Sequence, residues 1–182
     1  MQSIPRGRLL GVLALVLAGF AFSLATGSAG ADQGKHQVKQ RLVVRGDATI
    51  VDSPACPGGV CTLELTGGKF RGAPVGAGDY SGSMKLRVAE AFPNGEGGVC
   101  APIDGTIVLG AGSPNRLVLS VDGDSCQDGA GPPTAASFTG LARFEVKYGT
   151  GGYAGARGHG LASFAEDAAD HDRMTLIGRI AR

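Results

Sequence analysis

Apolar and polar residues alternate along most of the chain. In the first such run, Leu42 and Val44 fall on one face. Arg41, Val43 and Arg45 fall on the other. Because the side chains of a strand point alternately to its two faces, this pattern predicts strands with one buried and one exposed face. No segment beyond the N-terminal one keeps a helical period.

The alternation and its interruptions predict eight strands. They cover residues 38–51, 62–66, 80–92, 100–109, 116–121, 136–148, 153–164 and 173–180. We expect a Gly-rich connection at 67–78, a Gly/Asp/Pro-rich loop at 122–133 and an acidic turn at 166–170. Evenly spaced strands with Gly and Pro turns are typical of an all-β sandwich or barrel.

Two features favour a single antiparallel eight-stranded β-barrel over a β-sandwich. The strands at 80–92 and 136–148 are long, which suits the tilted strands of a barrel. Glycines also interrupt the predicted strands, at Gly82, Gly105, Gly140, Gly158, Gly160 and Gly178. A tightly coiled sheet needs glycine where it bends or where a large side chain lies against it.

The last Gly-rich hairpin, residues 148–160, is predicted to close the barrel. Its centre is expected between Thr150 and Gly151, with Tyr148 and Tyr153 placed symmetrically about it. That register puts Ala142 opposite His159. Arg143 and Glu145 would then lie on the other face from His159, which is expected to face solvent.

Residues 1–31 are predicted to be a signal peptide. Arg6 and Arg8 precede an apolar run at 9–24, and small residues at 28–31 favour cleavage after Ala31. The alternative is an uncleaved anchor helix, for which the run is short, since a span needs about 20 residues. We expect a flexible tail at 32–37 and one β-barrel domain at 38–182, secreted and without stable membrane insertion.

The charge of the mature chain is nearly balanced. Cleavage would remove two arginines and leave 151 residues, with 15 of the 17 basic residues against 16 acidic ones. Near-neutral, scattered charge gives no electrostatic reason to expect nucleic acid or an anionic membrane surface as a partner. The 32 glycines, absence of Trp and scarcity of Lys are typical of a GC-rich bacterial genome.

Four cysteines in an exported chain indicate disulfides. Cys56 and Cys61 flank a short Pro-Gly-Gly turn, and Cys100 and Cys126 are equidistant from Ser113. A hairpin about Ser113 would place the second pair opposite each other. We therefore predict the bonds Cys56–Cys61 and Cys100–Cys126. The alternative is a zinc site, for which the cysteine spacing is poor.

The closing hairpin resembles a signature of plant allene oxide cyclases and dirigent proteins. The matching positions are Gly149, Thr150, Gly151, Tyr153, Ala156, Arg157 and Gly158. The resemblance implies an eight-stranded antiparallel barrel, a small exported bacterial member of that family, and a homotrimer. It also implies cyclisation of a reactive small molecule or steering of radical coupling, but no catalytic position of the family matches here residue by residue.

Few residues suggest chemistry. Of the three histidines, only His159, between two glycines, is a candidate ligand contact, and no nucleophile elbow accompanies it. Acidic clusters at 166–172 and 122–124 could hold Ca²⁺, although solvated turns explain them better. We expect no metal and no cofactor.

The alternation of apolar and polar residues also predicts how the lumen of the barrel is filled. An eight-stranded barrel encloses side chains or one small ligand. We expect a packed apolar lumen with a shallow mouth near Tyr80 and Tyr148, which, with His159, are the candidate ligand-binding residues. The function we expect is a non-catalytic binding or structural module, for a small apolar ligand. The alternative is a cyclase or isomerase acting inside the barrel.

Overall fold

The computed structural model describes residues 38–52, 55–127, 137–167 and 169–182. The predicted signal peptide and the tail at 32–37 lie outside the described residues. Eight long strands form the fold, and each pairs antiparallel with its neighbours. They are β1 (Lys39–Asp52), β2 (Val60–Ala73), β3 (Gly76–Arg87), β5 (Val99–Leu109), β6 (Leu117–Gln127), β7 (Phe138–Gly149), β8 (Arg157–Glu166) and β9 (His171–Ala181).

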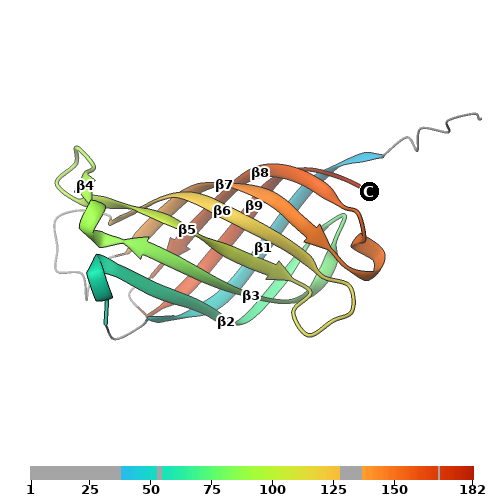
Figure 1. Cartoon of the computed structure of the whole chain (residues 1–182), viewed down its shortest axis with the longest axis horizontal. Helices are drawn as coiled ribbons and strands as arrows, with labels where there is room; N and C mark the ends of the chain where they lie inside the picture. Colours follow the sequence, from blue (N-terminus) through green and yellow to red (C-terminus); the bar gives the residue numbers. More distant parts are fainter. Residues whose placement is uncertain (1–37, 53–54, 128–136, 168) are drawn as a thin grey trace, which may run out of the picture. The chain divides into compact units, whose positions relative to one another are not determined.

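The sheet closes on itself. Its strands run in the order β3-β2-β1-β9-β8-β7-β6-β5, and β3 pairs with β5 to complete the ring (Figure 1). A two-residue strand, β4 (Phe92–Pro93), pairs with β5 outside the ring. Short 3₁₀ turns, η1 (Pro57–Gly59), η2 (Val88–Glu90) and η4 (Gly151–Tyr153), lie in the connections. The predicted eight-stranded antiparallel β-barrel is confirmed.

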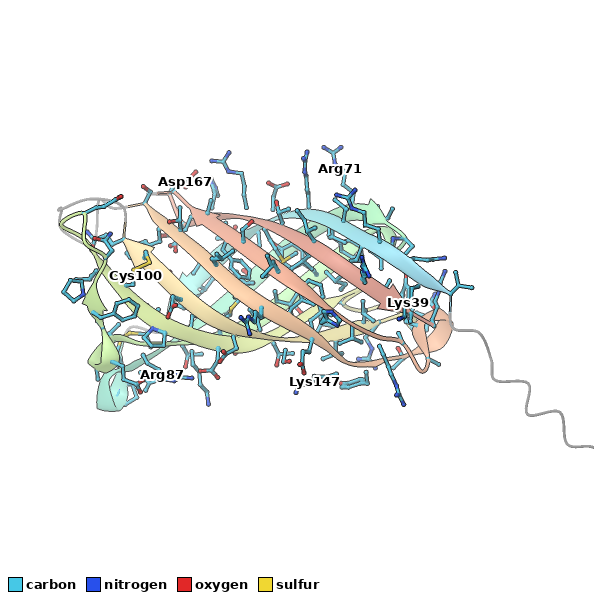
Figure 2. All side chains as sticks on the ribbon, turned by 90° about the horizontal axis from the view of Figure 1, so that it is seen from above. Lys39, Arg71, Arg87, Cys100, Lys147 and Asp167 are labelled. Carbon is cyan, nitrogen blue, oxygen red and sulfur yellow. A yellow bond between two sulfur atoms is a disulfide. The ribbon has the colours of Figure 1, made fainter. Side chains whose placement is uncertain are left out.

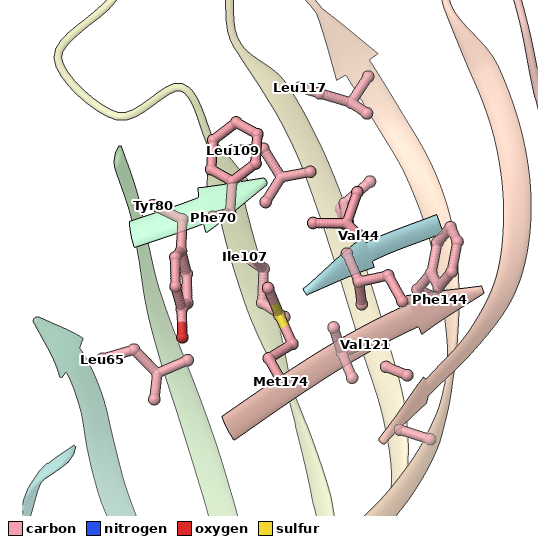
Figure 3. Packing of buried hydrophobic residues seen from close by; sticks show 14 of the residues in the cluster. Val44, Leu65, Phe70, Tyr80, Ile107, Leu109, Leu117, Val121, Phe144 and Met174 are labelled. Carbon is pink, nitrogen blue, oxygen red and sulfur yellow. The ribbon is translucent and has the colours of Figure 1, made fainter. Parts of the chain in front are cut away.

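The alternation along each strand divides lumen from surface. Leu42 and Val44 of β1 are fully buried, whereas Arg41 and Arg45 are exposed. The buried side chains of all eight strands form one core (Figure 3). Burial of such aliphatic and aromatic side chains stabilises by about 1.5–3 kcal/mol each, so the lumen is the main source of the barrel's stability.

Large aromatic side chains fill the lumen where the facing strands carry glycine. Phe144 lies over two neighbouring strands, and a Cβ added at Gly178 or Gly160 would come within 2.8 Å or 2.6 Å of its ring. Tyr80 lies in the same way against Gly46, at 2.8 Å from such a Cβ. Of the predicted interrupting glycines, Gly140, Gly160 and Gly178 therefore make room for rings.

Some predicted strand boundaries are wrong. Residues 67–78 are not a loose connection, because β2 continues to residue 73 and β3 begins at residue 76. Gly68 pairs with Tyr80 across these strands and leaves room for its ring. Likewise β6 extends through residues 122–127, where the sequence predicted a loop. At these positions glycine lies within a paired strand and does not end it.

The closing hairpin has a different centre from the one predicted. Glu145 pairs with His159, so the hairpin is symmetric about Gly152. Seven residues, 150–156, separate the two strands and include η4. Tyr153 packs against the core and donates a hydrogen bond to the Val75 carbonyl at 3.0 Å, whereas Tyr148 is 56% exposed. The two tyrosines are therefore not equivalent.

Polar contacts dock the hairpin on the turn between β5 and β6. The Thr150 hydroxyl donates to the Pro114 carbonyl at 2.7 Å and accepts from the Arg116 N–H at 3.1 Å. The Asn115 side chain accepts from the Gly152 N–H at 2.8 Å. These hydrogen bonds satisfy backbone groups of both loops and hold the hairpin across this end of the barrel.

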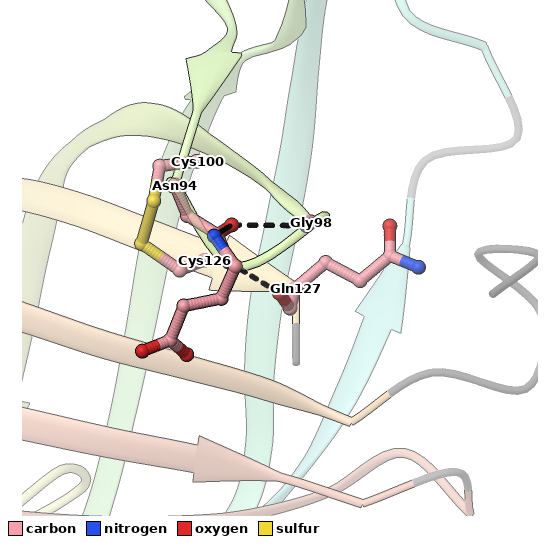
Figure 4. The surroundings of a disulfide bond; sticks show 6 residues. Asn94, Gly98, Cys100, Cys126 and Gln127 are labelled. Carbon is pink, nitrogen blue, oxygen red and sulfur yellow. Dashed lines mark hydrogen bonds between the residues drawn. A yellow bond between two sulfur atoms is a disulfide. The ribbon is translucent and has the colours of Figure 1, made fainter. Parts of the chain in front are cut away.

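Both predicted disulfides are present. Cys56 and Cys61 are joined around η1, and Cys100 lies directly opposite Cys126 in the β5–β6 ladder. Beside the second bond, the Asn94 side chain accepts from the Gly98 N–H at 2.9 Å and donates to the Gln127 carbonyl (Figure 4). This bond ties the two strands together at the end opposite the closing hairpin.

Removing the two disulfides should cost different amounts. The Cys100–Cys126 bond spans 26 residues and the Cys56–Cys61 bond spans 5. Loop-closure entropy then predicts losses of about 3.5 and about 2 kcal/mol in the free energy of unfolding when each pair is replaced by serine. Urea denaturation measures both, and a larger loss for the shorter loop would contradict the loop-closure account. Four free thiols in a non-reducing mass measurement would contradict both bonds.

The aromatic packing can be tested at one glycine. In Gly160→Ala, the new Cβ would lie 2.2 Å from the Ile177 carbonyl oxygen and 2.6 Å from the Phe144 ring. Overpacking should lower the free energy of unfolding by about 1–3 kcal/mol. Gly152→Ala is the matched control, because its Cβ would meet nothing closer than the Asn115 side chain at 3.6 Å. Equal stability of the two variants would refute the packing.

Candidate functional site

A small cavity remains at the end of the lumen that lies away from the closing hairpin. Its volume is about 40 Å³. Its lining is mostly apolar and includes Ile50, Leu63, Leu65, Met84, Ile103, Phe138 and Phe164. Three polar side chains, those of Ser125, Glu166 and Asp172, also face it. An apolar pocket with a few polar groups is the usual form of a small-molecule site.

Asp172 is the unusual residue of this cavity. It is only 2% exposed, and its Oδ2 atom has no hydrogen-bond partner within the described part of the chain. The alternation of β9 places it there, since Met174 and Leu176 point into the lumen with it. Buried polar atoms are nearly always hydrogen-bonded, so an unpartnered carboxyl oxygen calls for a ligand, a water or a proton.

Burial changes the ionisation of Asp172. Desolvation, together with the negative charge of nearby Asp47, raises the pKa of its carboxyl group to about 7. A backbone hydrogen bond from Ala165 opposes these effects and lowers the pKa. Because a buried carboxylate is costly without a partner, Asp172 holds its proton through mildly acidic conditions.

A second polar group in the lumen is coupled to Asp172. The Tyr80 side chain is 2% exposed, and its hydroxyl oxygen also has no hydrogen-bond partner in the described residues. Desolvation raises the pKa of Tyr80, and the charges of Asp172 and Asp47 raise it further. The phenol therefore stays neutral and can donate a hydrogen bond into the lumen.

The cavity limits what these groups can do. A volume of about 40 Å³ has room for a water molecule, whose share of the liquid is about 30 Å³, or for the tip of a larger molecule. Protonated Asp172 can donate a hydrogen bond to a carbonyl or hydroxyl oxygen, and ionised Asp172 can only accept one. The site can thus recognise an oxygen-bearing apolar group.

The residues predicted to bind a ligand do not come together. Tyr80 lies inside the lumen, but Tyr148 and His159 are exposed on the outside of the barrel. A register shift in the β6–β7 ladder precedes Tyr148 and turns its side chain outward. The predicted register of His159 is also wrong, because Glu145 lies opposite it on the same face. Its predicted exposure to solvent is confirmed.

The acidic clusters at 166–172 and 122–124 were the candidate calcium sites. The Asp167 side chain accepts hydrogen bonds from the backbone N–H groups of Ala169 and His171, and these bonds lower its pKa. Asp122 and Asp124 are exposed on β6. In the described ranges no three His, Cys, Asp or Glu side chains lie close enough together to hold a metal ion.

Asp172 was not among the site residues predicted from the sequence, where it was grouped with the acidic turn before β9. Extending the alternation of Met174 and Leu176 back by one step would have placed it in the lumen.

The described segments also contain no helix that is long and apolar enough to cross a membrane.

A larger hollow lies at the closing-hairpin end. Its volume is about 430 Å³, and its lining includes Phe70, Val75, Leu109, Asn115 and Tyr153. Two polar side chains of this hollow, those of Asn115 and Tyr153, take part in the hydrogen bonds that hold the hairpin, unlike Oδ2 of Asp172. We therefore place the candidate site at Asp172 and keep the hollow as the rival location.

Comparisons with protein-family models, with curated proteins and with solved structures found no match.

The raised pKa of Asp172 predicts a pH-dependent stability. Below pH 3.8, the ordinary pKa, the carboxyl is protonated in both the folded and the unfolded chain. As the pH rises towards 7, only the unfolded chain ionises, so the free energy of unfolding should fall by about 4 kcal/mol. Asp172→Asn should abolish this fall in urea titrations at successive pH values.

Asp167→Asn is the matched control. The pKa of Asp167 is lowered, so its contribution is present above pH 3.8 and is lost only below that value. This variant should keep the decline between pH 4 and 7. A decline that survives in Asp172→Asn would contradict the assignment of a raised pKa to Asp172.

Proposed function

We propose that this chain is a secreted, disulfide-stabilised β-barrel that acts as a non-catalytic binding module for a small apolar ligand. The N-terminal Arg-flanked apolar segment and the two disulfides support secretion, because structural disulfides persist in oxidising compartments. The observation that carries the binding role is the unpartnered, buried carboxyl of Asp172 in an apolar cavity. The ligand would be aliphatic, with a carbonyl or hydroxyl oxygen at its tip.

The second candidate is a cyclase or isomerase of the kind that the family resemblance implies. Asp172 favours it, because a carboxyl group with a pKa of about 7 can serve as a general acid or base near neutral pH. The room available speaks against it, because a pocket that encloses a whole molecule usually measures about 300–1,000 Å³, whereas binding needs to admit only the oxygen-bearing tip of a ligand. A binding role therefore accounts better for a cavity of about 40 Å³.

Methionine methyl spectra provide the test. Apart from Met1, the chain has two methionines, Met84 and Met174, and Met84 lines the cavity. Titration of the methyl-labelled protein with 2-hexanone should shift the Met84 signal. The binding should be about tenfold weaker at pH 8.5 than at pH 5.5, because ionised Asp172 cannot donate to the ketone.

Two variants locate the binding. Ser125→Leu should block the cavity and abolish the shift of the Met84 signal. Ala111→Leu places the same side chain in the rival hollow and should leave the shift unchanged. Loss of binding in Ala111→Leu alone would move the site to the hairpin end. A spectrum unaffected by the ketone in the unaltered protein would contradict the binding role at Asp172.

A further inference from the structure

The barrel separates its charges although the chain as a whole is nearly neutral. Seven exposed cations gather on the outside of β2, β1, β9 and β8. We call them the basic face: Lys39, Arg41, Arg45, Arg71, Arg157, Arg173 and Arg179. Figure 2 shows Lys39 and Arg71 extending from the outside of the barrel. The exposed acids Asp122 and Asp124 lie elsewhere, on β6.

The register brings cations of the basic face directly opposite one another. Arg41 pairs with Arg179, and Arg179 also lies opposite His159. Arg45 lies opposite Arg71. Side chains in such pairs are about 4.5–5.5 Å apart at Cβ, and like charges there destabilise a sheet. The isolated barrel therefore carries a repulsion that a bound anion would relieve.

In the described part of the chain, none of these cations forms a close ion pair. Among the described residues, the ion pairs are Lys69–Asp79, Arg87–Glu90, Arg87–Asp104 and His171–Asp167, and none includes a residue of the basic face. The outward acids next to this face are Asp47, beside Arg173, Asp167, whose pKa the charge of Arg173 helps to lower, and Glu145, beside His159. Three acids against seven cations leave most of the positive charge uncompensated.

An apolar row crosses the basic face. Val43 lies opposite Ile177, which lies opposite Leu161. Ile177 is 48% exposed and Leu161 is 53% exposed. The cations Arg41 and Arg179 border this row on one side. Exposed aliphatic side chains surrounded by basic ones form an amphipathic surface that has no covering element in the described chain.

We propose that the basic face docks the barrel on an anionic phospholipid surface. The Arg and Lys side chains would contact lipid phosphates, and Ile177 and Leu161 would enter the boundary between headgroups and acyl chains. A soluble polyanion, such as nucleic acid or polyphosphate, would use the cations but gain nothing from the aliphatic row. The face also lacks Phe, Tyr and Trp, on which the bases of a single strand could stack. The amphipathic composition therefore favours a lipid surface.

Vesicle flotation tests this proposal. The disulfide-bonded protein, made with and without residues 1–31, is mixed with vesicles of phosphatidylglycerol and phosphatidylcholine or of phosphatidylcholine alone. Both forms should float with the anionic vesicles, and the shorter form should not float with the neutral ones. Binding should weaken as salt rises, because salt screens exposed charges. Binding that requires residues 1–31 would overturn the proposal.

Substitutions on the basic face should separate its two components. Arg41→Gln with Arg179→Gln should lower vesicle binding by about tenfold or more, while relief of repulsion keeps the fold at least as stable. The double variant with Ile177→Ser and Leu161→Ser should lower vesicle binding several-fold. The dependence of that binding on salt should stay unchanged. The matched controls are Lys85→Gln with Arg116→Gln, and Val99→Ser, which remove exposed residues elsewhere. Thermal unfolding of each variant checks its fold.

Three further outcomes would overturn the proposal. The first is equal binding of the shorter form to neutral and anionic vesicles. The second is equal loss of binding in the variants and in their matched controls. The third is binding to polyphosphate without binding to anionic vesicles, which would assign the face to a soluble polyanion.

Discussion

The backbone pairing of β3 with β5 is the constraint on which the rest of the structure depends. It joins residues 80–86 to residues 103–109 and converts a meander of strands into a ring. With eight strands, the ring encloses an interior just wide enough for side chains to fill. Phe144 and Tyr80 fit that interior because glycines lie beside them on the neighbouring strands. The narrow interior of the closed ring thus explains why glycines lie beside its large aromatic side chains.

The same shortage of space directs function to the ends and the outside of the barrel. In the described lumen, side chains leave about 40 Å³ at Asp172, whose burial raises its pKa to about 7. Groups that could contact larger partners lie outward, where the register places Arg41 beside Arg179 and Ile177 beside Leu161. A small buried site for an oxygen-bearing tip and a broad amphipathic surface suit binding better than conversion of a large substrate.

The sequence predicted what depends on local pattern and symmetry. Alternation identified most strands, and the equal spacing of Cys100 and Cys126 about Ser113 predicted both their pairing and the register of β5 and β6. It failed where tertiary packing decides. Gly68 suggested a loop but lies in a strand beside Tyr80, and the 3₁₀ turn η4 moved the centre of the closing hairpin to Gly152. Net charge could not reveal the basic face, since only the register shows which cations become neighbours.

Amide hydrogen exchange tests the closure of the barrel most directly. In a closed ring, the paired amides of β3 and β5 are protected to the same degree as those of β1 and β9, because every one of these strands has a neighbour on both sides. A closed ring predicts slow exchange of the hydrogen-bonded amides between residues 80–86 and 103–109, close to the rate of global unfolding. Rapid exchange confined to these two segments would mean an open sheet with β3 and β5 as edges, and would contradict the packed lumen.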